Sequence, residues 1–177
     1  MSTSPFLIRP MQADDVPAML AVQAQCYPLP MNESGEVLLA RWQTCGDTAW
    51  VACDAQGRVV AYLVAHRTRC GQMPALGEAF EHADHAQVLH LHDLAIGLQA
   101  RGQGLALHLL REAGRHCGSA GLEGMTLVSV NDSHAFWFRL GWRDWTSPDA
   151  NDGALSTYGG KAAYMAIGAE ALHQLTR

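Results

Sequence analysis

The segment between residues 88 and 117 constrains the fold of this sequence more than any other part. Val88–Ile96 is rich in aliphatic residues, which predicts a β-strand, and it leads into the turn Gly102-Gln103-Gly104. Leu105–Cys117 then carries apolar side chains on one helical face and polar side chains on the other, which predicts an amphipathic helix. A strand that turns tightly into such a helix indicates a sheet covered by helices.

The elements on either side of this segment extend the same pattern. Residues 70–87 contain glycine, proline and acidic residues without a helical or strand period, so we expect a loop there. The overall order is strand, two helices, three strands, helix, strand, helix, strand. It predicts an α/β (α+β) fold with a mixed sheet flanked by helices, in a single domain over residues 1–177. The strands are expected at residues 6–9, 49–53, 59–66, 88–96, 125–130 and 163–167, and the helices begin near residues 16, 34, 105 and 133.

Composition excludes several classes of function. Only 12 Lys and Arg face 17 Asp and Glu, and the resulting formal charge of -5 disfavours nucleic acid or an anionic membrane as a partner. No apolar run reaches the roughly 18 residues that a membrane span needs, and the first residues do not resemble a signal peptide. The five cysteines form no C-x-x-C pair, which is typical of reduced thiols, so we expect a cytoplasmic protein.

The turn at residues 101–106 has the chemistry of a phosphate-binding loop. The N-terminus of a helix presents unpaired N–H groups and a partial positive charge, and small residues let a pyrophosphate approach that backbone. Arg101 would add a charge-assisted hydrogen bond to the same phosphate. The alternative is an ordinary strand-to-helix turn whose glycines provide only tight geometry. The segment lacks the third glycine of a dinucleotide-binding fingerprint and the Lys-Ser/Thr of a P-loop.

Two histidines precede this turn. Alternation along the strand predicts that His90 and His92 lie on one face of the sheet and Asp93 on the other. A histidine titrates near neutral pH, so it can accept a proton from an alkylammonium group directly or through a water. The alternative is that both histidines are half-buried packing residues.

Two motifs carry a family resemblance. Arg101-x-x-Gly104-x-Ala106, which follows Leu94-Ala95-Ile96, is similar to the acetyl-CoA motif of the GNAT N-acetyltransferase superfamily, and Phe136–Trp142 resembles its Phe-Tyr-x-x-Leu-Gly-Phe segment. The order of elements also fits that superfamily over nearly the whole chain. The resemblance implies a mostly antiparallel central sheet and acetyl-CoA as the co-substrate. The cofactor-binding residues that we infer from it and from the turn are Leu94, Ala95, Ile96, Arg101, Gly102, Gln103, Gly104, Leu105, Ala106, Asn131 and Trp137.

The resemblance also implies a reaction. The His90-x-His92 pair is similar to the His-x-His of the arylalkylamine N-acetyltransferase branch, whose histidines line the amine tunnel and help to remove the amine proton. We therefore expect direct acetyl transfer to a small-molecule primary amine in a ternary complex, with His92 and His90 as catalytic residues. The backbone N–H of Leu94 is expected to stabilise the thioester oxygen, while Ile96 pairs with pantetheine.

Trp137 departs from the family pattern. Many GNAT enzymes have a tyrosine at this position that protonates the departing CoA thiolate, whereas an indole N–H cannot act as an acid near neutral pH. Tyr158 is our candidate for this acid, and its alternative is a packing role at the edge of the domain. Asn131 has an alternative as well, because asparagine caps helices effectively.

The acceptor site is the least patterned part of the sequence. Tyr27 and Glu33 lie in the segment that borders the acceptor site in this superfamily, which makes them candidate substrate contacts. If the loop at residues 70–87 closes over the site, its acidic residues would attract a cationic amine.

Other functions and assemblies remain open. The chain could be a non-catalytic acyl-CoA-binding or regulatory domain, or a histidine-rich metal-binding module. The histidines at 82, 85, 90 and 92 do not have the spacing of a structural zinc motif, so we expect no metal. A homodimer is also open, with Trp142, Trp145 and the final strand as its candidate edge.

Overall fold

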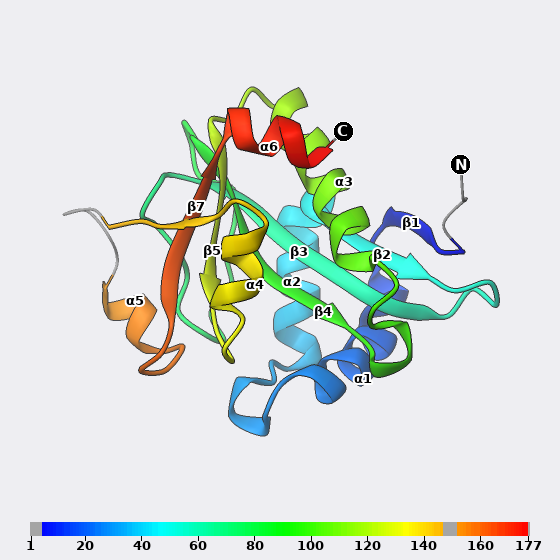
Figure 1. Ribbon diagram of the computed structural model, residues 1–177. Coiled ribbons are helices and arrows are strands. Elements are labelled where there is room, and N and C mark those ends of the chain that lie inside the picture. The colour runs from blue at the N-terminus through cyan, green and yellow to red at the C-terminus, as the bar shows by residue number, and fades with distance from the viewer. Residues whose placement is uncertain (1–4, 147–151, 177) are drawn as a thin grey trace.

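The computed structural model describes residues 5–146 and 152–176, and its centre is a seven-stranded sheet with helices on both faces (Figure 1). The strand order is β1-β2-β3-β4-β5-β7-β6. Every neighbouring pair is antiparallel except β4 and β5, which run parallel. The predicted mixed, mostly antiparallel sheet is therefore confirmed. The strands are β1 (Leu7–Pro10), β2 (Ala49–Cys53), β3 (Val59–Thr68), β4 (Val88–Ile96), β5 (Gly124–Ser129), β6 (Arg143–Asp144) and β7 (Ala163–Gly168).

The longer helices divide between the two faces of the sheet (Figure 1). Helices α1 (Val16–Cys26) and α2 (Gly35–Cys45) cover one face, whereas α3 (Leu105–Ser119) and α6 (Ala169–Thr176) cover the other. Helix α2 begins where predicted, because the Ser34 hydroxyl accepts a hydrogen bond from the N–H of Val37. The remaining helical segments are short: α4 (His134–Arg139), α5 (Asp152–Ser156) and the 3-10 turns Ala13–Asp15, Leu29–Met31, Gly46–Thr48 and Leu98–Ala100.

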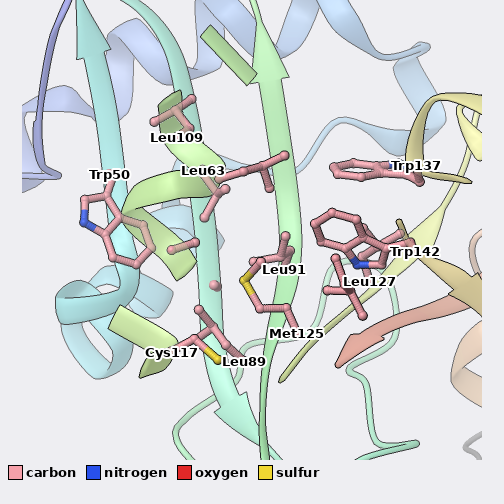
Figure 2. Close-up of a cluster of buried hydrophobic side chains, with 14 of the residues drawn as sticks. Trp50, Leu63, Leu89, Leu91, Leu109, Cys117, Met125, Leu127, Trp137 and Trp142 are labelled. Atoms are coloured by element: carbon pink, nitrogen blue, oxygen red, sulfur yellow. The ribbon is translucent and has the colours of Figure 1, made fainter. Parts of the chain in front are cut away.

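The sheet separates two apolar cores. On the α3 side, the predicted apolar face of the helix packs on β4 and β5, and Figure 2 shows Trp137 and Trp142 beside Leu91 and Leu127. On the α1 and α2 side, a second cluster includes Met19, Leu38, Val51 and Tyr62. This burial on both faces holds β4 rigidly in the middle of the molecule.

Two parts of the candidate dimer edge already make contacts within the chain, and dimerisation itself stays a prediction. Trp142 has no exposed surface and belongs to the core on the α3 side, so it cannot contact another chain. Strand β7 is also paired on both sides, with β5 and β6. The sequence did not reveal β6 and α6, because β6 has two residues and α6 follows β7 without a turn signal.

Strand β4 contains a register shift that changes which side chains share a face. Asp93 lies opposite Val64, but Leu91 lies opposite Ala65, so β4 has one additional residue at this bulge. Leu91 and Leu94 consequently face the α3 side together, and Asp93 joins His92 on the α1 and α2 side. The expectation that Asp93 would face away from the histidines is therefore wrong, because simple alternation fails across a bulge.

Strands β4 and β5 separate toward their C-terminal ends. Their pairing covers Val88–Leu91 and Gly124–Leu127, although β4 continues to Ile96 and β5 to Ser129. Figure 1 shows the two strands diverging beyond the paired region. The separation opens a wedge in the middle of the sheet, and α3 begins next to its wide end.

Candidate active site

A cavity of about 530 Å³ occupies the wedge between β4 and β5. Leu91 and Leu127, the last paired residues of the two strands, line its closed side. One end lies at the start of α3, where Arg101, Gly102 and Gly104 contribute to the wall. The other end lies beneath α1 and the loop at residues 70–87. It is lined there by Tyr27, Met31, Glu33, Leu76, His92, Asp93 and Tyr158.

The end of the cavity at α3 has the geometry of an anion site. Gly102 and Gly104 have φ angles of +76° and +77°, and a Cβ atom at either position would project into open space. The first bond of the helix here runs from the His108 N–H to the Gly104 carbonyl, so the first-turn N–H groups remain directed outward. These groups and the helix dipole favour a negative charge at this end.

Of the two polar side chains in this turn, one lines the cavity and the other does not. Arg101 lines the cavity, and its Nε donates to the Ile96 carbonyl at 3.2 Å. The Gln103 side chain donates to the Gln99 carbonyl, and Gln103 is not among the lining residues. Leu105 and Ala106 both line the cavity. The backbone of the turn therefore contributes more to this end than its polar side chains do.

The free edge of β4 borders the wedge. The Gly97 N–H bonds to Val60 in β3, and in an antiparallel ladder only every second residue directs its backbone groups to the partner strand. Ala95 therefore faces β3, whereas the backbone groups of Leu94 and Ile96 point the other way, toward the wedge. The Tyr27 hydroxyl lies 3.1 Å from the Leu94 carbonyl there, and the Ile96 carbonyl accepts a hydrogen bond from the Cys26 thiol.

His92 and Glu33 meet at the opposite end of the cavity. The His92 Nε2 lies 3.4 Å from the Glu33 Oε2, and both side chains are almost completely buried. The N–H of Gly77 donates to the Glu33 Oε1 at 2.9 Å. Burial alone would raise the pKa of Glu33, but its contacts with His92 and Arg41 outweigh burial and hold the pKa at about 2. Glu33 is therefore ionised throughout the neutral range.

Arg41 completes this ionic cluster behind Glu33. Its two Nη atoms bind the two carboxylate oxygens of Glu33 in the paired geometry typical of arginine. Its Nη2 also donates to the Glu78 carbonyl at 2.6 Å, and its guanidinium lies 4.7 Å from the centre of the Phe80 ring. Only 1% of Arg41 is exposed.

Asp93 forms a second buried acidic site beside the first. The Tyr27 hydroxyl donates to the Asp93 Oδ1 at 2.6 Å, and the Tyr62 hydroxyl donates to the Oδ2. Burial raises the pKa of Asp93, although these two hydrogen bonds act in the opposite direction. Both carboxylate oxygens thus have a phenol partner, which fixes the bulge of β4 against α1 and β3.

His90 lies apart from the cavity. Its Nδ1 is 3.0 Å from the Thr126 hydroxyl, and its ring stacks on Tyr164 and contacts His66. Burial lowers the pKa of His90 well below its usual value, and it lowers that of His66 to about 3. Both rings are therefore neutral members of a buried cluster, and of the two predicted catalytic histidines only His92 lines the cavity.

Tyr158 lies next to His92. The Tyr158 hydroxyl donates to the Pro74 carbonyl at 2.8 Å and is 3.5 Å from the His92 Nδ1. Burial raises the pKa of Tyr158, which makes its hydroxyl a weaker acid than an exposed tyrosine.

Trp137 and Asn131 line the cavity on the β5 and α4 side. The Trp137 indole N–H donates to the Ser133 hydroxyl at 3.1 Å, and its ring packs edge-on against Trp142. Asn131 has a φ of +50° and is not the cap of α4, since Ser133 occupies that position. The capping alternative for Asn131 is therefore wrong.

The loop at residues 70–87 contains no helix or strand, as predicted, and it is bonded to the cavity wall. Gly77 and Glu78 contact Glu33 and Arg41, as described above. On the other side, the Leu76 N–H donates to the Thr157 hydroxyl at 2.9 Å. The loop therefore covers the end of the cavity that contains His92.

Residues 5–146 and 152–176 contain neither a metal-ligand cluster nor a membrane-spanning helix. No three or more His, Cys, Asp or Glu side chains in these ranges are grouped so that they could hold a metal ion. In the same ranges, no helix has the length and apolar character required to cross a membrane.

Comparison with known families identifies the fold. A family model described as the acetyltransferase (GNAT) family matches residues 16–142, which include most of the sheet and the whole turn before α3. The chain belongs to the GNAT family. Among curated protein sequences, none is significantly similar to this GNAT chain.

Solved structures with the same GNAT fold are distant in sequence. The loading GNATL domain of CurA from Lyngbya majuscula has a TM-score of 0.73 at 13% identity, over 93% of this chain and 98% of that one. The GphF GNAT-like decarboxylase in complex with isobutyryl-CoA has a TM-score of 0.70 at 22% identity, over 92% and 98%. The PaiA N-acetyltransferase from Thermoplasma acidophilum, in complex with coenzyme A, has a TM-score of 0.64 at 14% identity, over 95% and 99%.

Sequence reasoning missed three residues of this GNAT site. No sequence pattern singled out Arg41, yet this residue is buried against Glu33. Asp93 was assigned to the wrong face, and Ser133 was considered only as the start of a helix. The proline-containing segment before α2 was the one available signal, because it places Glu33 directly before the Ser34 cap of that helix.

Proposed function

We propose that this protein is an acetyl-CoA-dependent N-acetyltransferase that acts on a small primary amine by direct transfer in a ternary complex. The observation that carries the proposal is one continuous cavity. It joins the N-terminus of α3, the free edge of β4 and the His92–Glu33 pair. An anion site, a strand edge and a buried base in line are the parts that this reaction requires.

The cavity walls fit acetyl-CoA, which would supply the activated acetyl thioester. The N–H groups at the start of α3 would bind its pyrophosphate, with Gly102 and Gly104 leaving the backbone accessible. The edge of β4 at Ile96 would pair with the pantetheine amides. The Leu94 N–H, which points into the wedge, would stabilise negative charge on the thioester oxygen. Family membership and the CoA complexes of neighbouring structures support this assignment.

The acceptor end favours an amine with one positive charge and an apolar body. Met31, Leu76, Tyr27 and Tyr158 provide apolar and aromatic wall. The Glu33 carboxylate is already bound by Arg41, Gly77 and His92, and that of Asp93 by Tyr27 and Tyr62. A second ammonium group of a polyamine would find no unpaired carboxylate among these residues, and burying it unpaired would be costly. This reasoning supports a small monoamine, as in the arylalkylamine branch.

His92 is the proposed proton acceptor. An ionised carboxylate only accepts hydrogen bonds, so Glu33 favours the tautomer of His92 that carries its hydrogen on Nε2. The Tyr158 hydroxyl donates to Pro74, which leaves the His92 Nδ1 as the basic atom on the cavity side. His92 would take the proton from the acceptor ammonium at this nitrogen, directly or through a water. His90, which contacts His66, Tyr164 and Thr126 in the core, would not exchange protons.

The departing thiolate requires a donor other than Trp137. Ser133 lines the cavity, and because its oxygen accepts the Trp137 N–H, its own hydrogen is available to another acceptor. Its other neighbour is the Ser129 hydroxyl at 3.2 Å. We propose that Ser133 donates a hydrogen bond to the thiolate, and that Tyr158, our earlier candidate, mainly forms the wall beside His92.

The test is a free-thiol assay of CoA release with a panel of amines, combined with calorimetric CoA binding. The panel contains phenylethylamine and tryptamine as monoamines, spermidine and an aminoglycoside as polycations, and free amino acids. Turnover confined to monoamines supports the proposal. Turnover of polycations alone would refute the acceptor class, and absence of CoA binding would refute the whole assignment.

The same assay decides between transfer and binding alone. The tryptophan in place of the usual tyrosine favours a non-catalytic acyl-CoA-binding domain as the second candidate. That function predicts CoA binding without turnover across the panel. The five cysteines are all unpaired thiols, which supports the proposed cytoplasmic location for either function.

A further inference from the structure

Arg41 is a buried cation that pairs with Glu33 at the acceptor end of the cavity and with the loop that covers this end. It lies on α2, and it contacts Glu33, the Glu78 carbonyl and the Phe80 ring. Arg41 does not line the cavity itself, so it cannot bind substrate directly. A fully buried guanidinium that touches no ligand must act through the residue it pairs with, and that residue is Glu33.

The pairing of Arg41 with Glu33 changes the net charge that lies next to His92. Arg41 and Glu33 together carry no net charge, so His92 lies beside a compensated carboxylate. Without Arg41, the same carboxylate would face His92 alone in a buried site. The protonated histidine would then form a neutral ion pair with Glu33, and it would hold its proton much more strongly. A base that holds its proton too strongly is already protonated when the substrate arrives.

We propose that Arg41 is a positioning residue that neutralises Glu33, so that Glu33 orients the His92 ring while His92 remains free to accept a proton. The proposal rests on the proposed function in one respect, namely that His92 is the proton acceptor. Arg41 also binds the loop through Glu78. Arg41 therefore contacts both the loop that covers the acceptor end and the carboxylate beside the proposed base.

The other ionisable groups near His92 do not replace Arg41. They comprise His66 and Tyr62 from β3, His90 and Asp93 from β4, Tyr27 from α1, Glu78 and His82 from the loop, and Tyr158. Burial keeps His66 and His90 neutral, and it raises the pKa values of the three tyrosines. Asp93 is bound by two phenols, His82 is paired with Asp47, and the Glu78 side chain bonds to the Ala75 N–H.

The test compares the pH dependence of kcat/KM in variants that change the charge of the cluster in opposite directions. Arg41→Gln should move the acidic limb to higher pH by about one unit, because an uncompensated carboxylate stabilises protonated His92. Glu33→Gln should move it to lower pH, because the cation is then uncompensated. In the double variant Arg41→Gln/Glu33→Gln, the acidic limb should return toward its wild-type position. Arg41→Lys keeps the charge, so its acidic limb should stay close to that of wild type.

A control removes another two-bond arginine–carboxylate pair, which is partly rather than fully buried. Arg9 on β1 binds Asp15 through two hydrogen bonds of 2.7 and 2.8 Å, and two strands separate β1 from β4. Arg9→Gln should lower stability without moving the pH profile. If Arg41 had only a structural role, Arg41→Gln would also reduce activity at every pH without shifting the acidic limb.

A second readout separates this inference from the proposed function. The His92 ring resonance, assigned with His92→Ala, can be titrated by NMR in the protein without substrates. If no amine is turned over, the proposed function fails, but the titration still reports whether Arg41 controls the proton on His92. An unchanged midpoint in folded Arg41→Gln would overturn the inference. If Arg41→Gln does not fold, an unchanged or raised midpoint in Glu33→Gln would overturn it.

Discussion

Substituting Gly104 by valine should damage CoA binding far more than it damages the fold. Gly104 begins α3 with a φ of +77°, and a Cβ atom there would stand in open space at the anion end of the cavity. A branched side chain in that space would cover the first N–H groups of the helix. These groups are the ones assigned to the pyrophosphate, so the substitution acts directly on the binding step.

The expected magnitudes follow from two separate effects. A non-glycine residue with left-handed backbone costs about 1–2 kcal/mol, which corresponds to a decrease of a few degrees in Tm for a chain of this size. Losing hydrogen bonds to a charged phosphate costs about 1.5–3 kcal/mol each, and about 1.4 kcal/mol changes an affinity tenfold. We therefore expect CoA affinity to fall by about 10- to 100-fold.

Gly57 provides a matched control for this experiment. It lies in the turn between β2 and β3 with a φ of +76°, it also has nothing within 4 Å of a Cβ, and it does not line the cavity. Gly57→Val should therefore lower the Tm by a similar amount and leave CoA affinity unchanged. Both quantities are measured by calorimetry on the purified variants. Equal CoA affinity in Gly104→Val and wild type would refute the assignment of the pyrophosphate to this turn.

Three further predictions concern the acceptor end and α2. His92→Ala should lower kcat/KM at neutral pH and lose less at high pH, where free amine is abundant; a loss that is the same at every pH would exclude His92 as the base. The pKa of Glu33 is about 2 in the folded protein, compared with 4.5 for an unperturbed glutamate. The ionised carboxylate therefore stabilises the fold fully above about pH 4.5, and this stabilisation is lost as the pH falls toward 2. The stability difference between wild type and Glu33→Gln, measured by denaturant unfolding, should therefore shrink between pH 5 and pH 3, and a constant difference would contradict this. Ser34→Ala should destabilise by about 0.5–2 kcal/mol through loss of the α2 cap, without changing CoA affinity in the same calorimetric titration.

The cofactor end of the cavity was predictable because it is local in sequence. The residues from Leu94 to Ala106 form one strand edge, one turn and one helix start, and the periods and glycines of that segment specify all three. Leu94, Ile96, Gly102 and Gly104 therefore line the cavity as the pattern indicated. Their binding roles remain predictions until CoA binding is measured.

The acceptor end was much less predictable because distant segments assemble it. Glu33, Gly77, His92 and Tyr158 come from four separate parts of the chain and meet through tertiary contacts. No local period encodes the Arg41–Glu33 pair, since burial of a charged helix residue depends on what packs above it. Tyr27 and Glu33 were found only through the family resemblance.

The bulge in β4 has a consequence for how the sequence of this protein can diverge. One additional residue between Leu91 and Leu94 turns His92 and Asp93 toward the same face, and it keeps the leucines on the opposite one. A substitution in this strand exchanges one side chain and leaves its neighbours in place. An insertion or deletion of one residue would instead reverse the orientation of every side chain on one side of it. Related sequences should therefore vary in composition along β4 while its length stays constant.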